Sequence, residues 1–111
     1  MAIQLTHEML RMTYELLRLT LPYRRWHLPH ADKVEFHVMA YKDRHSDALT
    51  TKGQHRIRVS NKVIQTLAAL TEAMAHEMIH LHDTSRAHHG RVFHKHADQV
   101  CKRHGFDRGR F

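Results

Sequence analysis

Apolar residues at helical spacing predict a helix near the start of the chain. They run from Met9 to Leu21 with charged residues between them, and Thr6 just before them has the side chain of an N-cap. Pro22 cannot continue a helix, so it ends the pattern. We therefore expect an amphipathic helix from Thr6 to about Thr20 that packs one face on a core.

Two later segments alternate between apolar and polar residues and predict strands. The first spans 34–41 (VEFHVMAY) and the second spans 55–60 (HRIRVS), in which Arg56 and Arg58 face outward. The polar segment between them, 42–53, contains Asp, Ser and Gly residues that favour turns. We expect the strands to form a small antiparallel sheet or hairpin with an exposed loop.

A long apolar stripe predicts the next helical segment. Ser60 and Asn61 have capping side chains, and the segment runs from Lys62 to about Asp83, either as one helix or as two divided at Thr71. Its apolar stripe consists of Val63, Leu67, Leu70, Met74, Met78 and Leu81. One side of this segment is therefore expected to be buried.

A final helix is predicted from Arg91 to His104. Gly105 is a natural C-cap, and the residues after it, 106–111, are expected to be a flexible basic tail. The order of elements predicts an α+β fold, and 111 residues are enough for one domain, 1–111, with one modest core.

The predicted helix before residue 84 contains a candidate metal-binding motif, His76-Glu77-Met78-Ile79-His80. Histidines four residues apart lie on the same face of a helix, so both imidazoles can reach one metal ion. Glu77 lies beside the metal, where its carboxylate can take a proton from a water. Because 14 of the 111 residues are histidine, the motif alone is a weak signal, and its place on an apolar helix strengthens it. The pattern is typical of zinc hydrolases of the zincin type.

A catalytic zinc ion takes three protein ligands and leaves one position for water. The candidates for the third ligand are His82, His88, His89, His94 and His96. His82 lies about 200° around the helix from His80 and points away. His89 precedes Gly90 at the start of the last helix and is better placed, while His88 and His94 stay open as alternatives. The compact zincins that place this ligand six residues after the second histidine are excluded, because the chain has Arg86 there.

The charge of the chain favours a polyanionic partner. There are 18 Lys and Arg against 11 Asp and Glu, which gives a formal net charge of +7 and a pI near 10.1. Such a balance indicates nucleic acid or only a solvated basic surface. The candidate nucleic-acid contacts are Arg24 and Arg25, beside Trp26 in a predicted loop, and Arg56 and Arg58 on the second strand.

Cysteine content and hydropathy indicate the compartment. The lone Cys101 excludes an intrachain disulfide and a cysteine-based zinc ribbon, so we expect a reducing environment. No apolar run approaches the 20 or so residues of a membrane span, and the first residues lack a signal-peptide pattern. We expect a monomeric, soluble protein of the cytoplasm, or of the host cytoplasm if it is viral. Association with the nucleoid stays open as a further location.

The order of elements, the HExxH helix and His89-Gly90-x-x-Phe93 at the start of the final helix together resemble the SprT-like domain of the Spartan type. The resemblance covers roughly Val34 to Gly105. It implies a zincin-like fold, with His89 as the third zinc ligand, and zinc-dependent proteolysis of DNA-bound proteins that DNA activates. Arg91 and Val92 replace the usual Pro-Glu pair of the family. Its frequent C-terminal zinc ribbon is missing, so the chain resembles a minimal catalytic domain of the kind that would suit a phage or mobile-element product.

Two functions are compatible with these residues. In the first, one zinc ion held by His76, His80 and His89 works with Glu77 as general base in an endopeptidase that acts on proteins bound to DNA, with single-stranded DNA or DNA–protein complexes as partners. In the second, zinc stabilises a non-catalytic DNA-binding or interaction module, which needs a fourth protein ligand. Glu77 favours the enzyme, because a structural site has no need for a carboxylate between its ligands. A metal-dependent nuclease is disfavoured, since acidic ligands for a hard cation are not evident.

Overall fold

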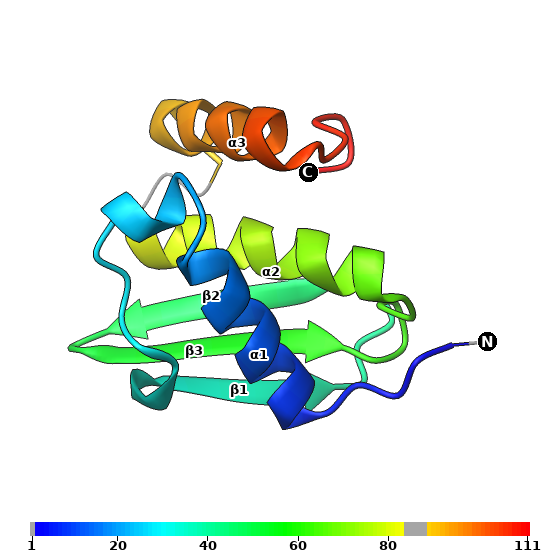
Figure 1. The fold of residues 1–111 in the computed structure, drawn as a ribbon. Helices are drawn as coiled ribbons and strands as arrows, with labels where there is room; N and C mark the ends of the chain where they lie inside the picture. The colour runs from blue at the N-terminus through cyan, green and yellow to red at the C-terminus, as the bar shows by residue number, and fades with distance from the viewer. Residues whose placement is uncertain (1, 84–88) are drawn as a thin grey trace.

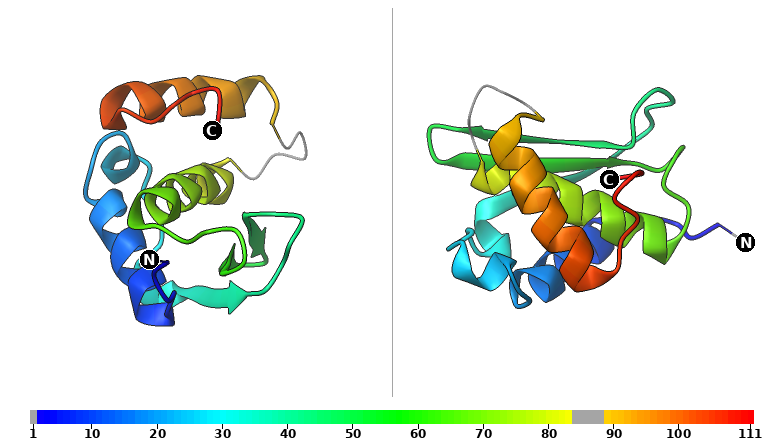
Figure 2. Two further views of the ribbon diagram at one scale, coloured as in Figure 1. Left: turned by 90° about the vertical axis from the view of Figure 1, so that its right-hand side faces the viewer. Right: turned by 90° about the horizontal axis from the view of Figure 1, so that it is seen from above.

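The computed structural model describes residues 2–83 and 89–111 and shows an α+β fold in which the helices lie on one side of a three-stranded sheet (Figure 1). The elements are α1 (His7–Arg18), η1 (Tyr23–Arg25), η2 (Ala31–Lys33), β1 (Val34–Met39), β2 (Ser46–Thr51), β3 (Gln54–Ser60), α2 (Leu67–His82) and α3 (Arg91–His104). α1 and α2 cover the sheet, and α3 lies on the far side of α2 from the sheet in both Figure 1 and the left view of Figure 2. Helix α2 is therefore enclosed between two layers.

The predicted cap of the first helix is confirmed. Thr6 Oγ1 accepts a hydrogen bond from the Met9 N–H at 3.1 Å, and α1 ends at Arg18, four residues before Pro22. The face of α1 that carries Leu10, Tyr14 and Leu17 is buried against the core, as the apolar spacing predicts.

The sheet is mixed, so the prediction of an antiparallel sheet or hairpin is wrong. Its strand order is β1-β3-β2, with β1 parallel to β3 and β2 antiparallel to β3. The chain leaves β1, forms the outer strand β2 and returns through a hairpin into the middle of the sheet. The hairpin turn contains Lys52 and Gly53, both with positive φ (49° and 79°), as a two-residue type I′ turn requires.

Strand β2 is absent from the sequence prediction, which places a polar loop over 42–53. Its inward residues are Ser46, Ala48 and Thr50, which are small or polar and so give no apolar alternation. Small side chains suit this strand because it packs beside α2 at the edge of the sheet. The apolar pattern is therefore too weak to reveal a strand.

The helix with the motif starts later than predicted. Thr66 has extended backbone angles and its Oγ1 accepts from the Ala69 N–H at 3.0 Å, so α2 runs from Leu67 to His82 rather than from Lys62. It is not divided at Thr71, whose hydroxyl donates to the Leu67 carbonyl inside the helix at 2.8 Å. The core beneath it includes the fully buried side chains Leu70, Met74, Met78 and Ile79.

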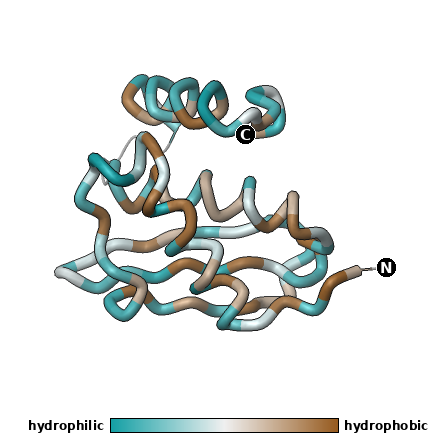
Figure 3. The backbone as a smooth tube through the Cα atoms, viewed as in Figure 1, coloured by the Kyte–Doolittle hydropathy of each residue, from teal (hydrophilic) through white to brown (hydrophobic). Residues whose placement is uncertain are grey.

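The last helix has the predicted bounds, and Gly105 follows it in the left-handed conformation with φ 77°. Figure 3 shows apolar and polar residues mixed along α3, as expected for a helix with one buried and one open face. The tail predicted to be flexible, 106–111, folds back toward α2. Arg110 pairs with Glu72 at 3.1 Å, and Phe111 contacts His76. These contacts make the tail part of the site described below.

In the described part of the chain, none of the helices has both the length and the apolar character needed to cross a bilayer.

Candidate metal centre

Helix α2 brings the two histidines of the motif together. His76 and His80 are half-buried, and their Nε2 atoms lie 3.3 Å apart. The spacing of four residues places them on one face, while the buried Met74 and Met78 hold the helix against the core. This face of α2 is directed toward α3 and the C-terminal segment.

His89 completes a triangle of nitrogens. Its Nε2 lies 3.2 Å from the Nε2 of His76 and 3.2 Å from that of His80. A tetrahedral zinc ion with Zn–N bonds of about 2.0–2.1 Å separates neighbouring ligand nitrogens by about 3.3 Å. The three imidazoles therefore have the geometry and donor type of a three-histidine zinc site.

Phe93 supports all three rings from one side. Its side chain is 2 % exposed, and its ring centroid lies 5.0 Å from that of His76, 4.8 Å from that of His80 and 4.5 Å from that of His89. His89 lies just before the N-cap of α3, Gly90, and four residues before Phe93, so the packing of α3 positions His89. The place of the candidate third ligand is thus set by tertiary packing.

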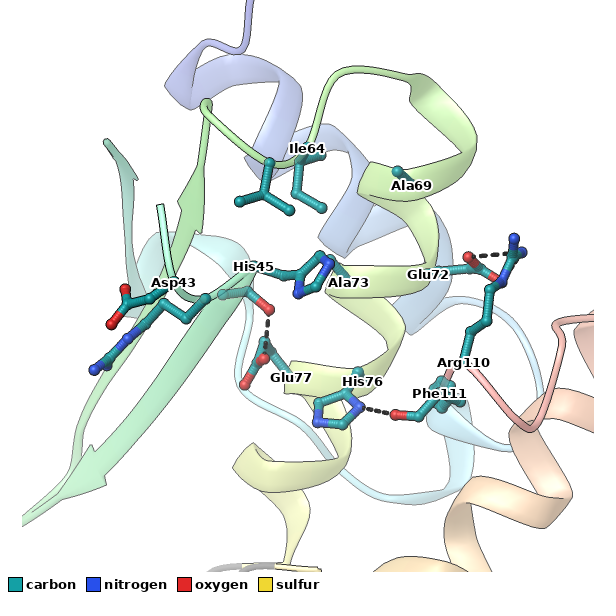
Figure 4. A pocket seen from close by; sticks show the side chains of 13 residues that line it. Asp43, His45, Ile64, Ala69, Glu72, Ala73, His76, Glu77, Arg110 and Phe111 are labelled. Carbon is teal, nitrogen blue, oxygen red and sulfur yellow. Dashed lines mark hydrogen bonds and ion pairs between the residues drawn. The ribbon is translucent and has the colours of Figure 1, made fainter. Parts of the chain in front are cut away.

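The tautomer of His76 is set by the C-terminal segment. His76 Nδ1 lies 2.6 Å from the main-chain oxygen of Phe111, which can only accept, so Nδ1 carries the hydrogen and Nε2 keeps a lone pair (Figure 4). Burial, together with the neighbouring His80, lowers the pKa of His76 to about 4. A neutral ring with Nε2 unprotonated is the form that binds a metal.

Glu77 lies on a different side of α2 and faces the sheet. Its side chain is 4 % exposed, and its Oε2 accepts a hydrogen bond from the Ser46 hydroxyl at 2.5 Å. Burial raises the pKa of Glu77 to about 7, the Ser46 hydrogen bond opposes this rise, and the nearby Asp47 adds to it. A carboxyl group with a pKa near neutrality is suited to exchange protons at physiological pH.

A pocket of about 550 Å³ opens beside His76 and Glu77 (Figure 4). One wall comes from the segment before β2, including His45, and the other comes from α2 and Arg110. The apolar part of its lining consists of Val63, Ile64, Ala69 and Ala73. The pocket is large enough for several atoms of a peptide side chain and adjoins the candidate base.

The other candidate ligands lie elsewhere. His94 Nδ1 is 2.7 Å from an Arg108 nitrogen, and His82 and His96 pack against Trp26 with ring centroids 4.3 and 4.6 Å away. These contacts confirm that His82 points away from the face of α2 that carries His76 and His80. His88 lies outside the described residues.

The four arginines predicted as nucleic-acid contacts differ in their surroundings. Arg24 and Arg25 are exposed in η1, and Arg56 is half-buried on the open face of the sheet. Arg58 forms a two-point ion pair with Asp47, at 2.7 and 2.6 Å. A role for these residues in binding nucleic acid stays a prediction.

The sequence prediction lacks a second group of cations, on α3, and two residues that contact the site, Ser46 at Glu77 and Phe111 at His76. Helix α3 carries the exposed residues Arg91, Lys95, Lys102 and Arg103, which form no ion pair within the described residues. The apolar periodicity of that helix is a usable signal for them, because it leaves them on the outer face. Ser46 and Phe111 give no such signal, since only the folded chain brings them to α2.

The described residues place three imidazole nitrogens at zinc spacing, and α2 also carries the buried Glu77 carboxylate on the side that faces the sheet. Comparisons with protein-family models, with curated proteins and with solved structures found no match to this chain.

Proposed function

We propose that this chain is a zinc-dependent endopeptidase with a zincin-like, SprT-like fold that acts on proteins associated with DNA. The observation that carries the proposal is the position of Glu77. It is buried, it lies between two histidines of the nitrogen triangle in sequence, and it lines a pocket that also reaches His76.

The residues divide the chemistry between metal binding and proton transfer. His76, His80 and His89 would hold the zinc ion through Nε2, and zinc bound there lowers the pKa of a coordinated water toward neutrality and polarises a carbonyl group. Glu77 accepts the proton of the attacking water and later delivers it to the leaving amine. The low exposure of Glu77 keeps bulk water from competing for that proton.

Zinc fits these ligands better than a hard cation does. Imidazole nitrogen is a good donor for zinc, whereas calcium and magnesium require oxygen ligands. Within the described residues, the group of side chains that can hold a metal consists of three histidines, and the Glu77 carboxylate turns toward Ser46 instead. This arrangement supports a metal site built from nitrogen donors alone.

A non-catalytic zinc module is the alternative function. A closed structural site takes four protein ligands, and within the described residues the group that can hold a metal has three members. His94, one candidate for the fourth, is in contact with Arg108. The buried Glu77 carboxylate also has no purpose in a structural site, so these observations favour the enzyme.

The exposed cations support the nucleic-acid part of the proposal. Arg24 and Arg25 lie on η1, and the cations of α3 lie on the neighbouring layer of the fold, because His104 near the end of α3 contacts Thr20 and Leu21 just before η1. Cations without acidic partners are available to phosphate groups. We therefore place the DNA-binding surface on η1 and α3 rather than on Arg58.

The test measures zinc content and cleavage of a DNA-bound basic protein by the wild type and by Glu77→Gln, with and without single-stranded DNA. One equivalent of zinc in both proteins with cleavage by the wild type alone is the expected result. Glu8→Gln, the same change at an exposed site on α1, is the matched control and should cleave normally. Equal cleavage by Glu77→Gln, or none by a zinc-loaded wild type in any condition, would contradict the proposal.

A further inference from the structure

One side chain on the sheet contacts the candidate base directly. The Ser46 hydroxyl donates to Glu77 Oε2 at 2.5 Å, which is the hydrogen bond drawn at Glu77 in Figure 4. A hydrogen bond to a charged or partly charged carboxylate is stronger than one between neutral groups. The contact joins β2 to the helix that carries the motif.

The main chain of Ser46 is held firmly in the sheet. Ser46 pairs with Val59 on β3, and the carbonyl of the preceding residue, His45, accepts the Ser60 N–H at 2.8 Å. Val59 and Ser60 are fully buried. The hydroxyl of Ser46 is therefore presented to α2 from a fixed backbone rather than from a loop.

The two oxygens of Glu77 are not equivalent. Oε2 is engaged by Ser46, whereas Oε1 accepts no hydrogen bond from any residue within 2–83 or 89–111. The terminal torsion of a glutamate side chain is broad, so a single strong hydrogen bond is enough to decide which way the carboxylate faces. In this site the Ser46 hydroxyl is the group that makes this choice.

We infer that Ser46 is a positioning residue that holds Glu77 Oε2, so that Oε1 is the oxygen that takes the proton from the attacking water. The inference rests on the proposed function. In the step, an O–H bond of water breaks, its proton bonds to Oε1, and its electron pair stays on the attacking oxygen, while the bond to Ser46 persists at Oε2. Ser46 itself exchanges no proton with the substrate.

The size of the effect follows from the geometry. A carboxylate that is free to rotate leaves the productive orientation, and proton transfer needs the acceptor within hydrogen-bond reach. Removing a hydrogen-bond partner that orients a functional side chain typically lowers activity by about 10- to 100-fold. Ser46→Ala should therefore lower kcat by about 10- to 100-fold. KM should change much less than kcat, because Ser46 is one of many residues that line the pocket and the substitution removes only its hydroxyl.

Three variants test the inference in the zinc-loaded protein. Ser46→Ala removes the hydroxyl, and Ser46→Thr keeps it and should restore kcat. Thr50→Val is the matched control, since Thr50 lies on the same strand and face but its hydroxyl contacts His55 at 3.1 Å. Zinc content should be one equivalent in all of them, which separates positioning of the base from loss of the metal.

A second measurement does not depend on activity. A double-mutant cycle of Ser46→Ala and Glu77→Ala can be measured by denaturant unfolding. The effect of the double mutant on the unfolding equilibrium constant should differ from the product of the two single-mutant effects by about fivefold or more. In the cycle of Thr50→Val with Glu77→Ala, the double mutant's effect should equal the product of the two single-mutant effects. If the effects of Ser46→Ala and Glu77→Ala were also independent, the hydrogen bond between Ser46 and Glu77 would be refuted.

The activity outcomes separate this inference from the function on which it rests. An active wild type with kcat unchanged in Ser46→Ala would overturn the role of Ser46 and leave the endopeptidase proposal standing. A kcat that falls in Ser46→Ala and also in Ser46→Thr and Thr50→Val would show general damage to β2 and overturn the inference too. A zinc-loaded wild type without any cleavage would overturn both proposals.

Discussion

Replacing His89 with alanine tests the proposed ligand set most directly, because His89 is the proposed ligand that comes from outside the motif. The variant keeps His76 and His80 on α2 but removes one corner of the nitrogen triangle, whose sides are 3.2 to 3.3 Å. Four-ligand zinc sites in small domains bind with about 10–16 kcal/mol, or roughly 2.5–4 kcal/mol per ligand. Removing one ligand should thus weaken zinc binding by about 100- to 1,000-fold.

The weaker binding can be measured as thermal stability. Zinc at 100 times the wild-type Kd stabilises the folded state by about 2.7 kcal/mol, but at the same concentration the variant gains about 0.4 kcal/mol or less. For a domain of this size the wild type should unfold about 10 °C higher with zinc than without it, and His89→Ala should show a shift of only a degree or two. Without zinc the variant should be no less stable, since His89 is exposed and its removal separates crowded nitrogens.

The assay combines thermal unfolding with competition against a chromophoric zinc chelator. His94→Ala is the control, because His94 is also an exposed histidine at the start of α3 but contacts Arg108. It should bind zinc as the wild type does. Wild-type zinc affinity in His89→Ala would refute the ligand assignment, and weaker binding in His94→Ala instead would identify His94 as the third ligand.

Three further predictions concern other parts of the molecule. The hydrogen bond from Arg18 lowers the pKa of Glu15. The stability that Glu15 provides is therefore present above its unfolded-state pKa and is lost as pH falls through its folded-state pKa. Glu15→Gln should cost about 1–2 kcal/mol in urea unfolding at pH 7 and less at pH 3. Phe93→Ala should cost about 3–5 kcal/mol in unfolding free energy and weaken zinc binding, as measured by the same chelator competition. Replacing Lys95 and Lys102 with glutamine should weaken single-stranded DNA binding and reduce the slope of log K against log salt by about 0.7 for each phosphate that is no longer neutralised.

Each of these predictions has a control elsewhere in the chain. Glu8→Gln should show no comparable pH dependence. Phe36→Ala, at a buried site on β1 that packs against Tyr14, should leave zinc affinity unchanged. Arg58→Gln should change the salt slope less than the α3 variants do. An equal cost of Glu15→Gln at both pH values would contradict the pKa argument. Tight zinc binding by Phe93→Ala would remove Phe93 as the support of the rings, and an unchanged salt slope would remove α3 from the DNA-binding surface.

The parts of the fold that depend on local patterns are predictable from the sequence. The caps at Thr6 and Gly105, the bounds of α3 and the shared face of His76 and His80 all follow from spacing within one helix. Strand β2 is not predictable in this way, because it faces α2 with Ser46 and other small residues. A strand whose inward side chains are small has no alternating apolar pattern, so the sequence does not predict it. Without β2, the mixed topology of the sheet cannot be predicted either.

The candidate site is also predictable only where it depends on local spacing in the sequence. Local spacing identifies His76, Glu77 and His80, but it leaves several histidines as possible third ligands. What selects His89 in the structure is the packing of Phe93 against the rings, a contact between two helices. Ser46 is likewise separated from Glu77 by 31 residues, so its hydroxyl has no signature in the sequence.

The arrangement of layers shows how α2 can serve the two proposed roles, metal binding and proton transfer. On α2 the proposed ligands His76 and His80 face α3 and the C-terminal segment, whereas Glu77 faces the sheet. Each proposed role is therefore supported by one layer, since Phe93 and Phe111 contact the imidazole rings and Ser46 holds the carboxylate. Substitutions in α3 should thus change zinc affinity first, and substitutions in β2 should change turnover with zinc still bound. If substitutions in α3 and in β2 both changed activity only by lowering zinc content, the site would be structural. A zinc ion that only links two helices does not need a general base that is held separately from its ligands.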